Sequence, residues 1–175
     1  LHDDAADTFA RHRTAIAQQI RVDGVTHNLH EQAAAGVSAR AWSLEALPLI
    51  IEVADWAQIE RGVIQRAQLL SRMLGDLYGP QRLLHDALLP PALVFRHSGY
   101  LRPVHGITPA GGMHLHIAAF DVARGVDGRW WVISQRTQSP SGLGYVLHNR
   151  LIVSRLFPEA FRELRVQHIA SSYRR

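Results

Sequence analysis

The residues best suited to chemistry lie in a stretch whose pattern predicts a β-hairpin over residues 113–135. Asp121 stands on an otherwise apolar first arm, and Ser134 and Arg136 stand at the end of the second. A carboxylate that faces a hydroxyl and a guanidinium is a candidate site for a metal ion, a phosphate or a carboxylate. The alternative is that Asp121 ends its strand at the sheet edge as a solvated acid.

The turn of this hairpin sets the pairing of those three residues. The Asp-Gly dipeptide at 127–128 favours a two-residue type I′ turn. That turn pairs Asp121 with Ser134 and places Arg136 opposite Ala119. Because side chains alternate along a strand and opposed residues share a face, Asp121, Ser134 and Arg136 are expected on one face of the hairpin.

A glycine-rich loop follows the hairpin and leads into a predicted helix. Ser141, Gly142 and Gly144 lie where unpaired backbone N–H groups and the helix dipole favour an anion. The alternative is an ordinary helix start in which Ser141 caps the first turn. Asn149 and Arg150 come shortly after this loop, and the sequence alone does not show their role.

Two histidines precede Asp121. His114 and His116 alternate on the expected first arm, so both would point to the face opposite Asp121. With His97 or His105 they could bind a transition metal through imidazole nitrogens. With 11 histidines in the chain, chance pairs are common, and the pattern has low specificity.

The elements that would position these residues form an α+β pattern. Helices are predicted over about 4–21, over about 55–78 from apolar spacing and a capping box, and over about 141–164 in two segments. Short strands are predicted over 25–29 and 92–96, and a loop or weak helical turn over 32–38. The expected fold is an α+β lobe with a mixed or antiparallel sheet, in which the hairpin is flanked by helices.

The composition is that of a globular protein. The chain has 175 residues, 47% of them hydrophobic and 19% charged, and no apolar run long enough to span a membrane. It contains no cysteine, which excludes disulfides and thiol nucleophiles. We expect no membrane partner and a cytoplasmic location. The net charge of +4 comes from dispersed arginines without any lysine, so we expect no nucleic-acid partner.

Several short motifs together resemble the circularly permuted ATP-grasp family, type 2. The central ones are LHIAAFDV, DGRWWVI and PSGLGYVLHNR, at residues 115–122, 127–133 and 140–150. Further matches are GVTHN, YGPQR, YLRP and RLFPE, at residues 24–28, 78–82, 100–103 and 155–159. The resemblance covers about residue 20 to the end, and its specificity comes from the order and spacing of the motifs.

The resemblance implies a role for the hairpin and for the loop. In that family an Asp on the first arm and a Glu-x-Asn on the second hold the magnesium ions that bridge the phosphates of ATP. The Asp matches Asp121, whereas the Glu and Asn positions are occupied by Ser134 and Arg136. Arg136 places a fixed positive charge where a dication would bind, and it could itself bind a phosphate or carboxylate. The loop at 141–144 would face the acceptor substrate, and Asn149 and Arg150, which match the motif after it, would be further candidates for binding a substrate or anion.

The resemblance therefore implies an ATP-dependent ligase that joins a small-molecule acid to an amine with Mg-ATP. We expect residues 1–175 to form a single domain or a fragment of such a protein, whose partner is the missing C-terminal part of the ATP-grasp fold. Without lysines and with replaced metal ligands, this chain is expected not to catalyse ligation alone. The alternative is a degenerate ATP-grasp-like domain that acts in binding or scaffolding.

Overall fold

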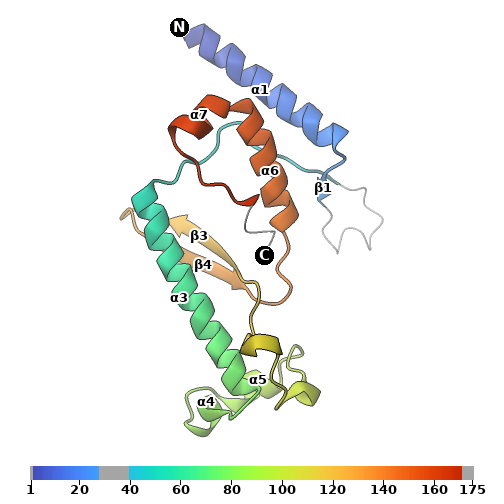
Figure 1. Ribbon diagram of the computed structural model, residues 1–175, viewed down its shortest axis with the longest axis vertical. Coiled ribbons are helices and arrows are strands. Elements are labelled where there is room, and N and C mark those ends of the chain that lie inside the picture. Colours follow the sequence, from blue (N-terminus) through green and yellow to red (C-terminus); the bar gives the residue numbers. More distant parts are fainter. Residues whose placement is uncertain (1, 28–39, 171–175) are drawn as a thin grey trace. The chain divides into compact units, whose positions relative to one another are not determined.

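The computed structural model describes residues 2–27 and 40–170 as a mixture of helices and antiparallel strands, which confirms the expected α+β class (Figure 1). The chain divides into two compact units. The first unit takes residues 1–50 and 142–175, and the second takes residues 51–141.

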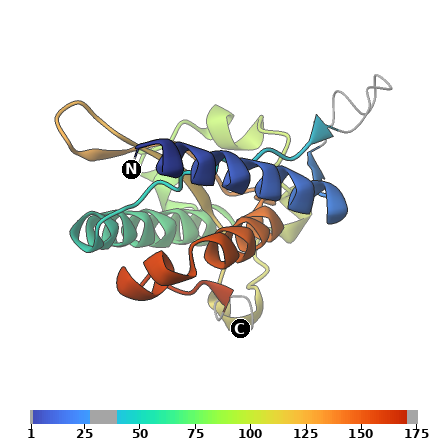
Figure 2. The ribbon, with the colours of Figure 1, turned by 90° about the horizontal axis from the view of Figure 1, so that it is seen from above.

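The first unit is built on two helices that contact each other. Figure 2 shows α1 lying against α6, in agreement with the contacts between these two helices. A two-residue antiparallel ladder pairs Thr26 with Ala41. The elements of this unit are α1 (His2–Val22), β1 (Thr26–His27), β2 (Arg40–Ala41), α6 (Leu143–Leu156) and α7 (Pro158–Glu163).

A small apolar core joins these helices. Ile16 and Ile20 are 2% and 3% exposed on α1, and Ile152 is 4% exposed on α6. Ala46 completes the buried cluster, and five half-buried residues pack around it: Phe9, Val25, Trp42, Leu44 and Leu156. The four-residue spacing of Ile16 and Ile20 places both on one stripe of α1, which is why this helix packs with a single face.

The second unit is organised by α3, a helix of 25 residues over Val53–Leu77. The spacing of apolar residues predicts this helix over 55–78. It begins two residues earlier than predicted, and the residue before its first turn is Glu52, without a side-chain cap. The other elements are α4 (Arg82–His85), α5 (Pro91–Phe95), the 3₁₀ turns Arg102–Val104 and Ala110–Gly112, β3 (Ala119–Arg124) and β4 (Trp130–Arg136).

Strands β3 and β4 form the predicted hairpin, which lies beside α3 within the same unit (Figure 1). Two polar contacts join them. Nη1 of Arg66 donates a long hydrogen bond of 3.5 Å to the side-chain oxygen of Gln135, and Nη2 of Arg124 lies 3.6 Å from a carboxylate oxygen of Asp55. Both contacts come from the face of the hairpin that carries Arg124 and Gln135, which is therefore the face turned toward α3.

The register of the hairpin is partly as predicted and partly different. Asp121 is paired with Ser134, and Ala119 with Arg136, as the turn pattern predicts. Nearer the turn, Arg124 pairs with Trp130 because the loop has three residues, 126–128, in place of two. Gly128 takes a left-handed φ of 78° there, and Gly125 N–H donates to the Arg129 carbonyl.

A bulge restores the predicted pairing toward the ends of the strands. The register shifts between Asp121 and Val122, where β4 contributes the extra residue Ile133. The longer loop and the bulge each displace the register by one residue, in opposite directions. Asp121 and Ser134 therefore meet although the predicted turn is wrong.

Two other predictions of strand structure are wrong. The first arm begins at Ala119, and residues 113–118 are not in a strand, so the predicted alternation of His114 and His116 does not apply. Residues 92–95 fall in α5, and Arg96 is its C-cap, so this segment is not a strand. Pro91 stands at the first position of α5, where its fixed φ and missing N–H favour a helix start.

Some predictions concern residues outside the described part of the chain. These are the loop or weak turn over 32–38 and the last two residues of the strand over 25–29. No helix in the described ranges has the length and apolar character needed to cross a bilayer.

Candidate functional site

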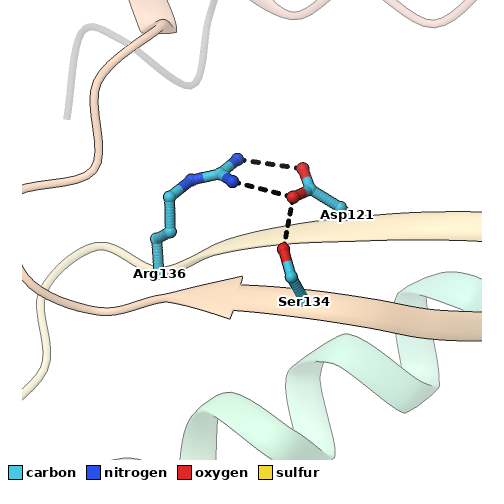
Figure 3. Close-up of polar contacts among 3 residues, drawn as sticks. All are labelled: Asp121, Ser134 and Arg136. Atoms are coloured by element: carbon cyan, nitrogen blue, oxygen red, sulfur yellow. Dashed lines mark hydrogen bonds and ion pairs between the residues drawn. The ribbon is translucent and has the colours of Figure 1, made fainter.

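The face of the hairpin that is turned away from α3 carries a compact polar cluster (Figure 3). The guanidinium of Arg136 donates to both carboxylate oxygens of Asp121, with Nη1–Oδ2 at 2.7 Å and Nη2–Oδ1 at 2.9 Å. The hydroxyl of Ser134 donates to Oδ2 of Asp121. The structure thus brings together the three residues that the register places on one face.

The electrostatics of the cluster follow from these contacts. The hydrogen bonds from Arg136, and then the one from Ser134, hold the pKa of Asp121 below its ordinary value. In turn, the carboxylate of Asp121 raises the pKa of Arg136. The side chains of Arg136 and Asp121 are 55% and 49% exposed, so water screens the pair. Asp121 is therefore an ionised carboxylate that already has a cationic partner.

The cluster does not fit the magnesium site that the sequence resemblance implies at Asp121. Magnesium prefers an octahedral set of oxygen ligands with several carboxylates. Here one carboxylate is held by a bidentate guanidinium, which has no lone pair for a metal and carries a positive charge. Over residues 2–27 and 40–170, no group of three or more His, Cys, Asp or Glu side chains could hold a metal ion.

The boundary between the two units falls inside the glycine-rich loop. Ser141 is the last residue of the second unit, and Gly142 begins the 142–175 stretch of the first unit. The residue at the N-cap of α6 is Gly142, with a left-handed φ of 111°, and not Ser141 as the sequence predicts. The helix begins at Leu143, so Gly144 lies in its first turn. A role for Ser141, Gly142 and Gly144 in anion binding stays a prediction.

Asn149 and Arg150 have structural contacts within the first unit. The side-chain oxygen of Asn149 accepts a 2.9 Å hydrogen bond from Nε1 of Trp42. The guanidinium of Arg150 lies over the ring of Phe161, 5.5 Å from its centroid. These contacts fix the direction of both side chains, and their predicted role toward a substrate stays a prediction.

His114 and His116 lie in the second unit beside the C-terminal half of α3. They line an open hollow of about 340 Å³ together with six mainly apolar residues: Leu74, Tyr78, Val104, Ile107, Pro109 and Met113. The His114 ring sits so close to Gly75 that a Cβ there would come within 3.2 Å of its Cδ2 atom. The His114 ring can occupy this place because residue 75 is a glycine, which has no side chain.

Sequence reasoning did not find the residues that hold the segment around Asn149. The rings of Trp42 and Tyr145 stack with centroids 4.4 Å apart, and the Tyr145 hydroxyl donates a 2.6 Å hydrogen bond to the Thr26 carbonyl. Nothing in their spacing along the chain indicates that they meet.

Comparison with known proteins places the sequence in a defined group. Residues 48–175 match the family of circularly permuted ATP-grasp proteins, type 2. A protein of Mycobacterium tuberculosis is 38% identical over 160 residues, which are 88% of this chain and 18% of that protein. A Synechocystis protein is 36% identical over 132 residues, which are 75% of this chain and 27% of that protein.

A second protein of Mycobacterium tuberculosis is 33% identical over 166 residues, which are 95% of this chain and 29% of that protein. All three relatives are named only as uncharacterized proteins. The chain spans between 18% and 29% of the length of these relatives.

Proposed function

Because the chain belongs to the circularly permuted ATP-grasp type 2 family, we propose that it is one part of an ATP-dependent carboxylate–amine ligase and does not catalyse ligation by itself. The substrates of the whole protein would be a small-molecule acid and an amine. The partner of this chain would be the rest of the ATP-grasp fold. The small share of each relative that the chain covers supports this proposal.

The hairpin is the structural feature that supports this proposal. Two strands alone form a marginal sheet, and a third strand or a covered face is needed for independent stability. On β4, the large apolar side chains of Trp131 and Ile133 are 55% and 66% exposed. This surface is suited to further packing, as expected for a hairpin that belongs to a larger nucleotide-binding lobe.

The ion pair between Asp121 and Arg136 favours a second candidate. The guanidinium of Arg136 donates to both carboxylate oxygens of Asp121, so this acid is not available to hold the metal ion that it would bind in a ligase. In this alternative, the chain is a degenerate ATP-grasp-like domain that acts in binding or scaffolding. The same residue, Arg136, would then bind a phosphate or carboxylate only after it leaves Asp121.

Calorimetric titration with Mg-ATP separates the two functions. We would titrate this chain and, in parallel, the longest protein encoded by its parent gene. Binding by the longer protein, weakened by Asp121→Ala, would support the ligase. Binding by neither protein would favour the degenerate domain. Turnover of ATP by the 175-residue chain would contradict both.

Restoring the metal ligands gives a sharper test. The variant with both Ser134→Glu and Arg136→Asn carries the Glu-x-Asn pattern beside Asp121. We expect it to bind Mg²⁺ more tightly than the parent chain, because two oxygen ligands replace a hydroxyl and a cation. Arg124→Asn is the matched control, since it removes another arginine ion pair from the same hairpin. Equal Mg²⁺ affinity in all three proteins would mean that positions 134 and 136 do not determine metal binding.

A further inference from the structure

The hollow beside the C-terminal half of α3 is the most apolar site of the second unit. Its walls are the end of α3 and the segment with the two 3₁₀ turns, which lies beside this end of the helix in Figure 1. Its volume of about 340 Å³ is at the lower end of the range for small-molecule sites. Six of the eight lining residues are aliphatic, aromatic, proline or methionine, and the other two are His114 and His116. A ligand that fits this hollow therefore needs an apolar body.

Hydrogen bonds hold the two walls together. The Gly106 N–H donates a 2.7 Å hydrogen bond to the Tyr78 carbonyl, and the Leu101 N–H donates one of 3.1 Å to the Tyr78 hydroxyl. The Tyr78 ring also stacks on Tyr100, with centroids 5.1 Å apart. The walls are thus in place before a ligand enters, which reduces the entropy cost of binding.

His114 and His116 supply the hydrogen-bond donors of the hollow. In the part of the chain that the structure describes, neither side chain has a hydrogen bond or an ion pair. An imidazole has at least one N–H donor whether it is neutral or protonated. Each ring can therefore donate to a ligand in either state. The packing of the His114 ring on Gly75 keeps that ring against α3.

The charges of the two walls favour a ligand that is negatively charged. No Asp or Glu lies between Asp86 and Asp121, a stretch of the sequence that supplies six of the eight lining residues and contains Arg96 and Arg102. On the α3 wall, Asp76 is turned to α4, where its two carboxylate oxygens accept backbone hydrogen bonds of 3.0 and 2.9 Å. An anion in the hollow would thus meet donors and no lining acid, whereas a cation would meet no carboxylate.

We propose that this hollow binds a small carboxylic acid with an apolar body, in its ionised form. The apolar body packs on the wall that includes Leu74, Ile107 and Met113, and the carboxylate accepts a hydrogen bond from an N–H of His114 or His116. An ionised carboxylate only accepts hydrogen bonds, and a hydrogen bond to an ionised group is stronger than one between neutral groups. The proposal uses only residues of the second unit and does not depend on ligase chemistry.

Calorimetric titration of the chain with hexanoate and phenylacetate tests the site. Phenylacetamide and phenethylamine keep the ring and lack the negative charge, so both should bind at least tenfold more weakly than phenylacetate. Acetate keeps the carboxylate and lacks the apolar body, so it should likewise bind at least tenfold more weakly. If neither hexanoate nor phenylacetate binds, or if the amide or the amine binds as well as phenylacetate, the proposal is wrong.

Removing both imidazoles tests the assigned donors. The variant with His114→Leu and His116→Leu should bind phenylacetate at least tenfold more weakly than the parent chain. The variant with His85→Leu and His168→Leu is the matched control, because both of these histidines are exposed and lie outside the hollow. Equal affinity of the two double variants for phenylacetate would overturn the proposal.

A change in the apolar wall gives a second test that does not depend on the histidines. Ile107 is 59% exposed, so Ile107→Ser should leave the fold intact and weaken the binding of phenylacetate at least threefold. Leu88→Ser is the control, since Leu88 is 68% exposed and does not line the hollow. Circular dichroism melts of all these variants would show that they remain folded. If Ile107→Ser binds phenylacetate as well as Leu88→Ser does, the ligand does not occupy this hollow.

Discussion

Trp42 and Asn149 are 107 residues apart in the sequence and are joined by a hydrogen bond from the indole Nε1 to the side-chain oxygen. The Trp42 backbone N–H also donates to the Val25 carbonyl at 3.0 Å. Together with the stacking of Trp42 on Tyr145, these contacts tie the segment around β1 and β2 to α6. One half-buried tryptophan therefore holds two distant parts of the first unit together.

Trp42→Phe should destabilise the chain by about 1 kcal/mol, because it keeps an aromatic ring for stacking and removes the N–H donor. The measurement is urea denaturation followed by circular dichroism. Trp56→Phe is the control, since Trp56 is 43% exposed on α3 in the other unit. Equal denaturation midpoints for the two variants would contradict the assigned role of the indole nitrogen.

Ile152→Ala should cost about 2–5 kcal/mol of stability, because it leaves a cavity among the buried side chains of the first unit. Val146→Ala on the same helix is the control. Val146 is 51% exposed, so its truncation should change stability by about 0.5 kcal/mol or less. Thermal or urea unfolding of both variants gives the comparison, and similar losses would mean that Ile152 is not in a packed core.

Two glycine substitutions should change stability in opposite directions. Gly128 has a φ of 78° in the hairpin turn, so Gly128→Ala should destabilise the protein by about 1 kcal/mol. Gly62 lies inside α3 with open space where a Cβ would stand. Gly62→Ala should therefore stabilise it by about 0.5–1 kcal/mol. Shifts of the same sign in the melting temperatures would contradict one of these two backbone conformations.

The ion pair between Asp121 and Arg136 should make the stability of the fold depend on pH in the acidic range. The pKa of Asp121 is lowered in the folded chain, so its contribution to stability is complete above the ordinary carboxylate pKa of about 3.9. It is lost as the pH falls through the lowered pKa. Asp121→Asn should thus lower the melting temperature at neutral pH and have progressively less effect in acid.

The effect should be small, since both side chains are about half exposed. Asp7→Asn, which changes an exposed acid on α1, is the control and should show no such trend. A melting difference for Asp121→Asn that stays constant into strong acid would show that the ionised carboxylate does not stabilise the fold.

Local patterns in the sequence predict the long helices well. The apolar stripe over 55–78 corresponds to α3, and the predicted helix over 4–21 corresponds to α1. Both depend on spacing within one element, which the sequence contains. The strand predicted at 92–96 is wrong because a short apolar run fits either structure, and Pro91 at a helix start decides between them.

The sequence does not predict contacts between residues that are far apart along the chain. The pairing of Asp121 with Ser134 is predicted correctly through two errors that cancel, a loop that is too short and a missing bulge. The bidentate closure of Asp121 by Arg136 depends on side-chain conformations, which no pattern along the chain encodes.

The extra residue Ile133 has a consequence for how this hairpin can vary between related chains. If the bulge straightened and Ile133 paired with Asp121, Ser134 and Arg136 would move to the opposite face of the hairpin. A deletion of Ile133 would remove the bulge and still leave Ser134 opposite Asp121. Homologues that keep this polar cluster should therefore have either the bulged residue or a second strand that is one residue shorter at this place.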